Sequence, residues 1–247
     1  MRIQRAGVSR GSGLPIMTCG CLAIGVGTVV LMFIAVLILL PEMPNIAAQM
    51  IGLTPLGSVD EAFVANPVVI PAVQDAQPVD QVTFNVEGYG QQVIQDQPQL
   101  YDFTLGTVNG QQAVTATFTE TGLLDLCRQR TTLCSGQNPQ IQNVSIDLRP
   151  GGAIVYADAT LAQLGGISQR MGAVLTLDAS GRRLEFAGVD INGSLFNSSE
   201  GDLGTLVNQI EQGANEILTT LTLQAGGSQY RLSRISIDDG TLTLFLQ

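Results

Sequence analysis

The pattern of apolar and polar positions divides the chain into three regions. Residues 22–40 form an apolar run of nineteen residues without a charge. At about 1.5 Å per residue, a helix of this length crosses roughly the hydrocarbon core of a bilayer. Residues 41–80 carry six prolines and no sustained period, which predicts a Pro-rich tether. From Gln81 onward, period-two alternation predicts a folded domain over 81–247.

Charges beside the apolar run indicate the topology. Arg2, Arg5 and Arg10 precede the run, and no acid does, so residues 1–21 are expected to form a basic cytoplasmic tail. The alternative is a cleaved signal peptide, whose apolar core is usually about 7–15 residues long and is followed at once by small residues. This run is longer, and the nearest small-residue site, near Ala47, lies well past it. We therefore expect a single-pass plasma-membrane protein with an extracytoplasmic C-terminal domain.

Alternating runs predict the strands of the domain. An Asn109-Gly110 step between two such runs is typical of a tight hairpin turn. Further turns are expected at Pro150-Gly151-Gly152 and at Asp238-Asp239-Gly240. The predicted strands are 82–87, 101–107, 113–119, 141–148, 153–161, 173–177, 184–191, 230–237 and 241–246.

Two helices interrupt this pattern. Thr119 or Thr121 can cap a first helix that begins beside them. A second helix, over 203–221, carries a single apolar stripe at spacings of three and four residues. The order of elements, βββ-α-ββββ-α-ββ, predicts an α+β domain. In that domain a strongly curved antiparallel sheet carries both helices on its concave face.

Composition then limits the partners and the reactions that the chain can be expected to have. All 21 acids lie after residue 40, together with eight of the eleven arginines, which argues against a nucleic-acid partner. The chain has no histidine, which excludes Ser-His-Asp catalysis and removes the commonest zinc ligand. We predict no catalytic residue, no metal site and no cofactor. The least favoured alternative is an exported hydrolase that uses carboxylates such as Asp147, Glu185 and Asp190.

Cys127 and Cys134 are the two cysteines of the predicted extracytoplasmic part. On one continuous helix they would lie about 10 Å apart along the axis, too far for a disulfide. A disulfide therefore requires the helix to break near 130–132, which the β-branched pair Thr131-Thr132 favours. Two buried free thiols are the alternative.

Three phrases of the domain resemble a known family. They are Thr119-Glu120-Thr121-Gly122-Leu123-Leu124, the IQNVSIDLRPGG stretch of 141–152, and the closing ISIDDGTLTL stretch of 235–244. Together with the amphipathic helix, they are similar in order to small bacterial members of the tubular lipid-binding (TULIP) superfamily. The nearest in layout are the LmeA-like and YpmS-like proteins, which also have an N-terminal membrane segment. The resemblance covers roughly 81–247.

The resemblance implies a helix in the hollow of a bent sheet, with acyl chains in an apolar channel between them. The residues expected to line such a channel are Leu123, Leu124, Leu206, Val207, Ile210, Ile217 and Leu221. The same residues equally suit a closed core, in which case the chain is a structural or scaffolding protein of the cell envelope with a protein partner. Under either interpretation the chain contacts the membrane through its N-terminal helix.

Overall fold

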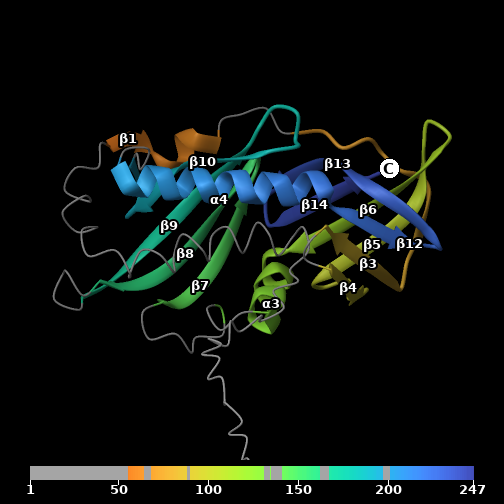
Figure 1. Ribbon diagram of the computed structural model, residues 1–247, viewed down its shortest axis with the longest axis horizontal. Helices are drawn as coiled ribbons and strands as arrows, with labels where there is room; N and C mark the ends of the chain where they lie inside the picture. Colours follow the sequence, from red (N-terminus) through yellow and green to blue (C-terminus); the bar gives the residue numbers. More distant parts are fainter. Residues whose placement is uncertain are drawn as a thin grey trace, which may run out of the picture.

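The computed structural model describes residues 55–63, 68–87, 90–130, 134, 141–161, 167–196 and 201–247. The fold is mostly β, with a strongly curled eight-stranded antiparallel sheet beside a second, open six-stranded sheet. Figure 1 shows the two sheets along the long axis, with helix α4 lying across them. The strand orders are β1-β11-β10-β9-β8-β7 and β2-β5-β6-β14-β13-β12-β3-β4.

Most elements match the alternation in the sequence. The strands are β1 (Pro55–Ser58), β2 (Gln74–Pro78), β3 (Gln81–Val86), β4 (Gly90–Gln95), β5 (Tyr101–Val108), β6 (Gln111–Thr119), β7 (Ile141–Arg149), β8 (Gly152–Leu161), β9 (Ile167–Leu177), β10 (Leu184–Ile191), β11 (Ser194–Phe196), β12 (Thr222–Ala225), β13 (Ser228–Asp238) and β14 (Thr241–Leu246). The helices are the 3-10 helix η1 (Val59–Phe63) and the α-helices α3 (Glu120–Arg130) and α4 (Gly201–Thr220).

The hairpin between β5 and β6 turns at Asn109 and Gly110, as predicted. Their φ angles are 53° and 78°. Two successive residues with positive φ are what a two-residue hairpin turn of the primed type requires, and Asn followed by Gly adopts them at the lowest cost. The strands on either side pair in full register from Tyr101 with Phe118 to Val108 with Gln111.

The expectation of one curved sheet is wrong, because the strands form two sheets. Alternation indicates which side of a strand is buried, but it does not specify the neighbouring strand. The β7–β8 hairpin pairs with β9, whereas the β13–β14 hairpin pairs with β6 through β14 and with β12 through β13. The pairing of β14 with β6 joins segments far apart in the chain, so the local pattern carries no signal for it.

The two sheets meet along β13. β12 pairs only with the first residues of β13, so the rest of that edge is open to other partners. The backbone N–H of Ile235 donates to the carbonyl of Gly181 at 2.6 Å, and the N–H of Gly151 donates to the carbonyl of Ile237 at 2.8 Å. The hairpin turns of the six-stranded sheet therefore dock on β13 of the other sheet.

Helix α3 bridges the two sheets. Its N-cap is Thr119, whose hydroxyl accepts the N–H of Gly122 at 3.1 Å. The Glu120 carboxylate accepts the N–H of Leu148, at 2.7 Å, and so ties the helix start to β7. Since α3 also follows directly from β6, it connects a strand of each sheet.

The helix ends at Arg130, within the range where the sequence required a break. Cys127 and Cys134 form a disulfide with their Cα atoms 5.7 Å apart. Both cysteine side chains are buried in the main core. The pairing is the one that the sequence favoured over two free thiols.

The predicted tether is wrong for the described part of 41–80. Pro55–Ser58 pairs with β11, and Gln74–Pro78 pairs with β5. Between them, the carbonyl of Val68 accepts the hydroxyl of Ser236 at 2.8 Å. Residues 55–63 and 68–80, hereafter the strap, belong to the folded domain, which therefore begins earlier than the predicted boundary at Gln81.

The predicted membrane span at 22–40, with the tail before it and residues 41–54 after it, lies outside the described residues. Within the described part of the chain, no helix is both long and apolar enough to cross a membrane.

Candidate functional site

The inner faces of both sheets and the two helices share one hydrophobic core. Its members include Phe84 and Phe118 of the eight-stranded sheet, Val155 and Leu175 of the six-stranded sheet, and Leu218 of α4. A single core therefore spans both sheets.

Aromatic rings fill the interior of the eight-stranded sheet. Phe84, Phe103, Phe118 and Tyr101, hereafter the aromatic cluster, are at most 2 % exposed. Their ring centroids lie between 5.9 and 6.4 Å apart, at the tilted or edge-to-face angles that aromatic pairs prefer. Burial and a hydrogen bond from its hydroxyl to Asp125 raise the pKa of Tyr101. This half of the interior is packed by the chain's own side chains.

Small aliphatic side chains cover the centre of the inner face of the six-stranded sheet. Here β8 and β9 place residues directly opposite one another in three pairs on one face, and all six are at most 3 % exposed. We call this surface the apolar floor. The pairs are Ala153 with Leu175, Val155 with Ala173, and Ala157 with Met171. Three of the six are alanines, and all six side chains are covered by the rest of the molecule.

Helix α4 attaches to the edge of the six-stranded sheet through two side chains. The buried amide of Asn215 accepts the N–H of Leu184 and donates to its carbonyl, both at 2.9 Å. One turn earlier, Glu211 accepts the N–H of Phe186 at 3.3 Å. β11 pairs only with the far end of β10, so the helix satisfies the backbone groups that β11 leaves open.

The structure brings four of the seven predicted channel residues into the common core. Leu123 and Leu221 are buried at 1 % exposure, and Leu124 and Ile217 are half-buried against the core. Leu206, Val207 and Ile210 lie on α4, but their side chains are outside the described residues. The floor residues Ala157 and Ala173 were missed, because an alanine in a strand gives no sign of what lies above it.

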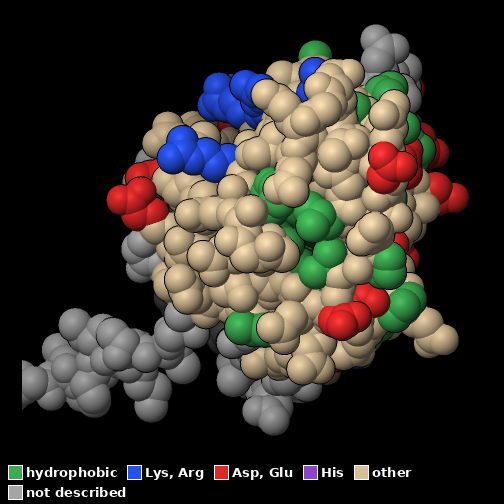
Figure 2. Space-filling model, turned by 90° about the vertical axis from the view of Figure 1, so that its right-hand side faces the viewer, with side chains coloured by type: hydrophobic (Ala, Val, Ile, Leu, Met, Phe, Trp, Pro, Cys, Tyr) green, Lys and Arg blue, Asp and Glu red, His purple; other side chains and the backbone are tan. Residues whose placement is uncertain are grey.

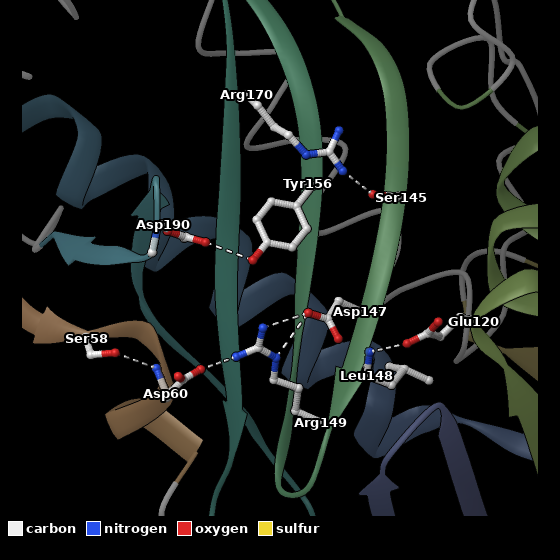
Figure 3. A network of polar contacts seen from close by, with 11 residues as sticks. Ser58, Asp60, Glu120, Ser145, Asp147, Leu148, Arg149, Tyr156, Arg170 and Asp190 are labelled. Carbon is white, nitrogen blue, oxygen red and sulfur yellow. Dashed lines mark hydrogen bonds and ion pairs between the residues drawn. The ribbon is translucent and has the colours of Figure 1, made fainter.

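A polar network covers the outer face of the six-stranded sheet, as Figure 3 shows. Arg149 forms ion pairs with Asp60 of η1, at 2.5 Å, and with Asp147, at 2.9 Å. Its guanidinium also lies 5.5 Å from the ring centroid of Phe63. Partial burial lowers the pKa of Arg149, but the hydrogen bonds to Asp147 and Asp60 together have the larger, opposite effect. The pKa is therefore raised above its ordinary value. The network therefore holds the strap against the sheet.

Asp190 is the buried acid of this face, at 4 % exposure. Its carboxylate accepts the hydroxyl of Tyr156 at 2.8 Å and the N–H of Gly193 at 2.7 Å. Burial, followed by the bond to Asp190, raises the pKa of Tyr156 to about 12. Both carboxylate oxygens thus have structural partners, one in the turn after β10 and one on β8, across the intervening strand β9.

Comparison with known proteins assigns neither a family nor a function to the chain. No known protein family, curated protein or solved structure matches the chain. Nor do the described residues contain a group of three or more acids or cysteines placed to hold a metal ion.

Proposed function

We propose that this chain is a single-pass membrane-anchored protein whose extracytoplasmic domain binds an acyl chain of a membrane lipid. The observation that carries the proposal is the apolar floor, in which three of six side chains are alanines and which shares its core with an amphipathic helix. Aliphatic chains bind in concave apolar sites because each Å² of apolar surface removed from water contributes roughly 25 cal/mol.

The two faces of α4 support this assignment. In the last two turns of α4, Ala214 and Leu218 are buried, and so is Leu221 just beyond the helix. Gln212 and Glu216, in the same part of the helix, are exposed. In the proposal, the acyl chain lies between the floor and the apolar face of α4, and these two layers part to admit it, because the floor residues are at most 3 % exposed. In its finer form, the proposal is a TULIP-like arrangement, with the helices in the hollow of the bent sheets.

The strap supports a location close to the membrane. Pro55 pairs with Phe196 of β11, and α4 begins at Gly201, so the chain enters the domain beside the start of the helix. Fourteen residues separate the predicted span from Pro55. Fully extended, they reach about 50 Å, whereas a forty-residue tether would reach about 140 Å. The shorter distance suits a domain that takes its ligand from the bilayer.

A scaffolding protein with an envelope protein partner is the second candidate. The observation in its favour is β4, the edge strand of the eight-stranded sheet, where Val93 is 57 % exposed. An open edge strand of this kind pairs with an added strand from another protein. The aromatic cluster suits this function as well, because a packed interior holds no ligand.

Photocrosslinking of the full chain in bacterial membranes distinguishes the two candidates. The membranes contain lipids with a diazirine at the acyl terminus, and the labelled peptides are identified by mass spectrometry. We expect labelled peptides from 153–177 and from 206–221, in addition to those from 22–40. Label confined to 22–40 would rule out acyl binding by the domain and leave the scaffold.

A matched pair of variants strengthens the test. Ala173→Leu adds three carbons above the floor and is expected to remove the label from 153–177, because the new side chain occupies the ligand's space. Ala179→Leu makes the same change in an exposed turn and is expected to leave the label unchanged. Equal labelling in both variants would contradict the placement of the ligand on the floor.

A further inference from the structure

An open pocket lies where α4 ends, between α4, β13 and the turn that joins β9 to β10. Its volume is about 320 Å³, and its lining includes Arg182, Arg231, Ser233, Thr219, Leu218 and Leu232. Figure 2 shows arginine side chains gathered toward one corner of this end of the molecule, with apolar side chains near its centre. The pocket is separate from the apolar floor and from the polar network of the outer face.

The turn that carries Arg182 is held rigidly. The Asp178 carboxylate accepts the N–H groups of Arg182 and Arg183 at 2.8 and 2.9 Å. Partial burial raises the pKa of Asp178, but its bonds from Ser180 and from the backbone outweigh this and lower it. Gly181 has φ +66° and approaches β13 so closely that an added Cβ would lie 2.7 Å from the carbonyl oxygen of Ile235.

A β-bulge in β13 orients the guanidinium of Arg182. Leu232 pairs with Leu246 and Arg234 with Phe245, so Ser233 is the extra residue without a partner in β14. Its carbonyl accepts the Nε–H of Arg182 at 3.1 Å. This single bond fixes the plane of the guanidinium, while its two terminal nitrogens have no partner among the described residues.

The charge of this surface is opposite to that of the protein. The chain has 21 acids against 11 arginines, yet Arg182, Arg183, Arg231 and Arg234 all come from the β9–β10 turn and β13. Within the described part of the chain, the ion pairs involve only Arg149 and Arg170, so none of these four has an acidic partner. Glu87 and Arg231 line an adjoining hollow without forming an ion pair.

A structural role at the end of α4 is the simpler explanation for these arginines, since cations are favourable at a helix C-terminus. The carbonyls of Glu216 and Ile217, near the end of α4, and that of Leu221, just beyond it, have other partners, however. Thr219 and Thr220 donate to the carbonyl of Glu216, and the N–H of Leu232 donates to that of Leu221. Neither Arg182 nor Arg231 is bonded to the helix end, so both guanidinium groups remain available.

We propose that Arg182 and Arg231 form a binding site for a phosphate group, with the hydroxyl of Ser233 as an additional donor. Guanidinium groups suit this ligand because their planar N–H pairs match the spacing of phosphate oxygens. A cavity of about 320 Å³ holds a phosphate together with the part of a molecule attached to it. The phosphate is supplied either as a free anion or by the headgroup of a phospholipid.

The site is tested on the full chain reconstituted in nanodiscs of phosphatidylcholine. Thermophoresis measures binding of three soluble probes, namely inorganic phosphate, dihexanoyl phosphatidic acid and dihexanoyl phosphatidylcholine. Binding of phosphate and phosphatidic acid at equal affinity identifies a free-anion site. Phosphatidic acid binding at least about tenfold more tightly than phosphate identifies a headgroup site.

Arginine variants decide whether this pocket is the site. Arg182→Gln and Arg231→Gln are each expected to weaken binding by about tenfold, because each removes one charge-assisted contact. Arg128→Gln, at an exposed position of α3, is the matched control and is expected to bind as the wild type does. Circular dichroism of each variant checks that the fold is kept.

Two outcomes would overturn the proposal. One is no binding of phosphate or phosphatidic acid by the wild-type chain. The other is equal weakening by Arg128→Gln and by the two pocket variants, which would indicate a general charge effect. Both readouts are independent of acyl-chain photocrosslinking, so the phosphate site stands or fails separately from the proposed lipid-binding function.

Discussion

The interiors of the two sheets are built from different side chains, although they belong to one core. The eight-stranded sheet curls around the aromatic cluster and fills its own hollow. The six-stranded sheet presents the apolar floor, and α4 is attached to its edge by Asn215. The difference suits a division of roles, in which the aromatic cluster supplies most of the stability and the apolar floor carries the proposed ligand. Four predictions test that division.

The largest effect is expected from Phe118→Ala in the aromatic cluster. Phe118 is fully buried and touches three other rings, so its loss leaves a cavity that costs about 4 kcal/mol of unfolding free energy. Met171→Ala on the apolar floor is the matched change in the other sheet and is expected to cost about half as much. Urea denaturation followed by circular dichroism measures both. Equal losses would show that the two interiors are packed alike.

The next effect concerns the attachment of α4. Asn215→Leu leaves both the N–H and the carbonyl of Leu184 buried without partners, at a cost of about 2–3 kcal/mol. Hydrogen exchange is expected to accelerate at Leu184 and along α4, while β5 and β6 keep their protection. Faster exchange in both sheets would mean that the helix supports the whole core rather than the six-stranded half.

The disulfide is expected to contribute about 2 kcal/mol, since it closes a short loop in the unfolded chain. The double variant Cys127→Ala with Cys134→Ala tests this by thermal denaturation. Because α3 contacts both β6 and β7, we expect the two sheets to lose stability together. An unchanged melting temperature would contradict a stabilising role for the bond.

The smallest effect is expected on the outer face of the six-stranded sheet. Tyr156→Phe removes one hydrogen bond to Asp190 and costs about 1 kcal/mol at neutral pH. The pKa of Tyr156 is raised to about 12 in the folded state, so its contribution is complete below pH 10 and is lost as the pH rises toward 12. The wild type should therefore lose its advantage over the variant in that range. Urea denaturation at a series of pH values measures this, and a constant difference would contradict it.

Much of the fold followed from local patterns. The alternation at 101–119, the Asn109-Gly110 turn and the stripe of α4 each involve residues close in sequence, whose geometry depends on their own backbone preferences. The strap was misread for the same reason. Gln74–Pro78 is exposed throughout, so the strand has no alternation, and only its pairing with β5 makes it a strand.

The charged pocket could not be predicted from the sequence either. Arg182-Arg183 was visible as a pair after a turn, and Arg231 and Arg234 stood fifty residues later. The β9–β10 turn docks on β13 through the hydrogen bond from Ile235 to Gly181. These two residues are far apart in the sequence, so no local pattern indicates the contact. The arginines become one surface only when the two sheets meet.

The sequence by itself determined which side of most strands is buried, where the hairpins turn and which face of α4 is apolar. The topology expected from the apolar run at 22–40 stays a prediction. The tertiary structure alone decided that the strands form two sheets, that the strap belongs to the domain and that Arg182 and Arg231 line one pocket. The reason is physical: side-chain periodicity reports burial at each position, whereas partners in a sheet are selected by packing across the whole chain.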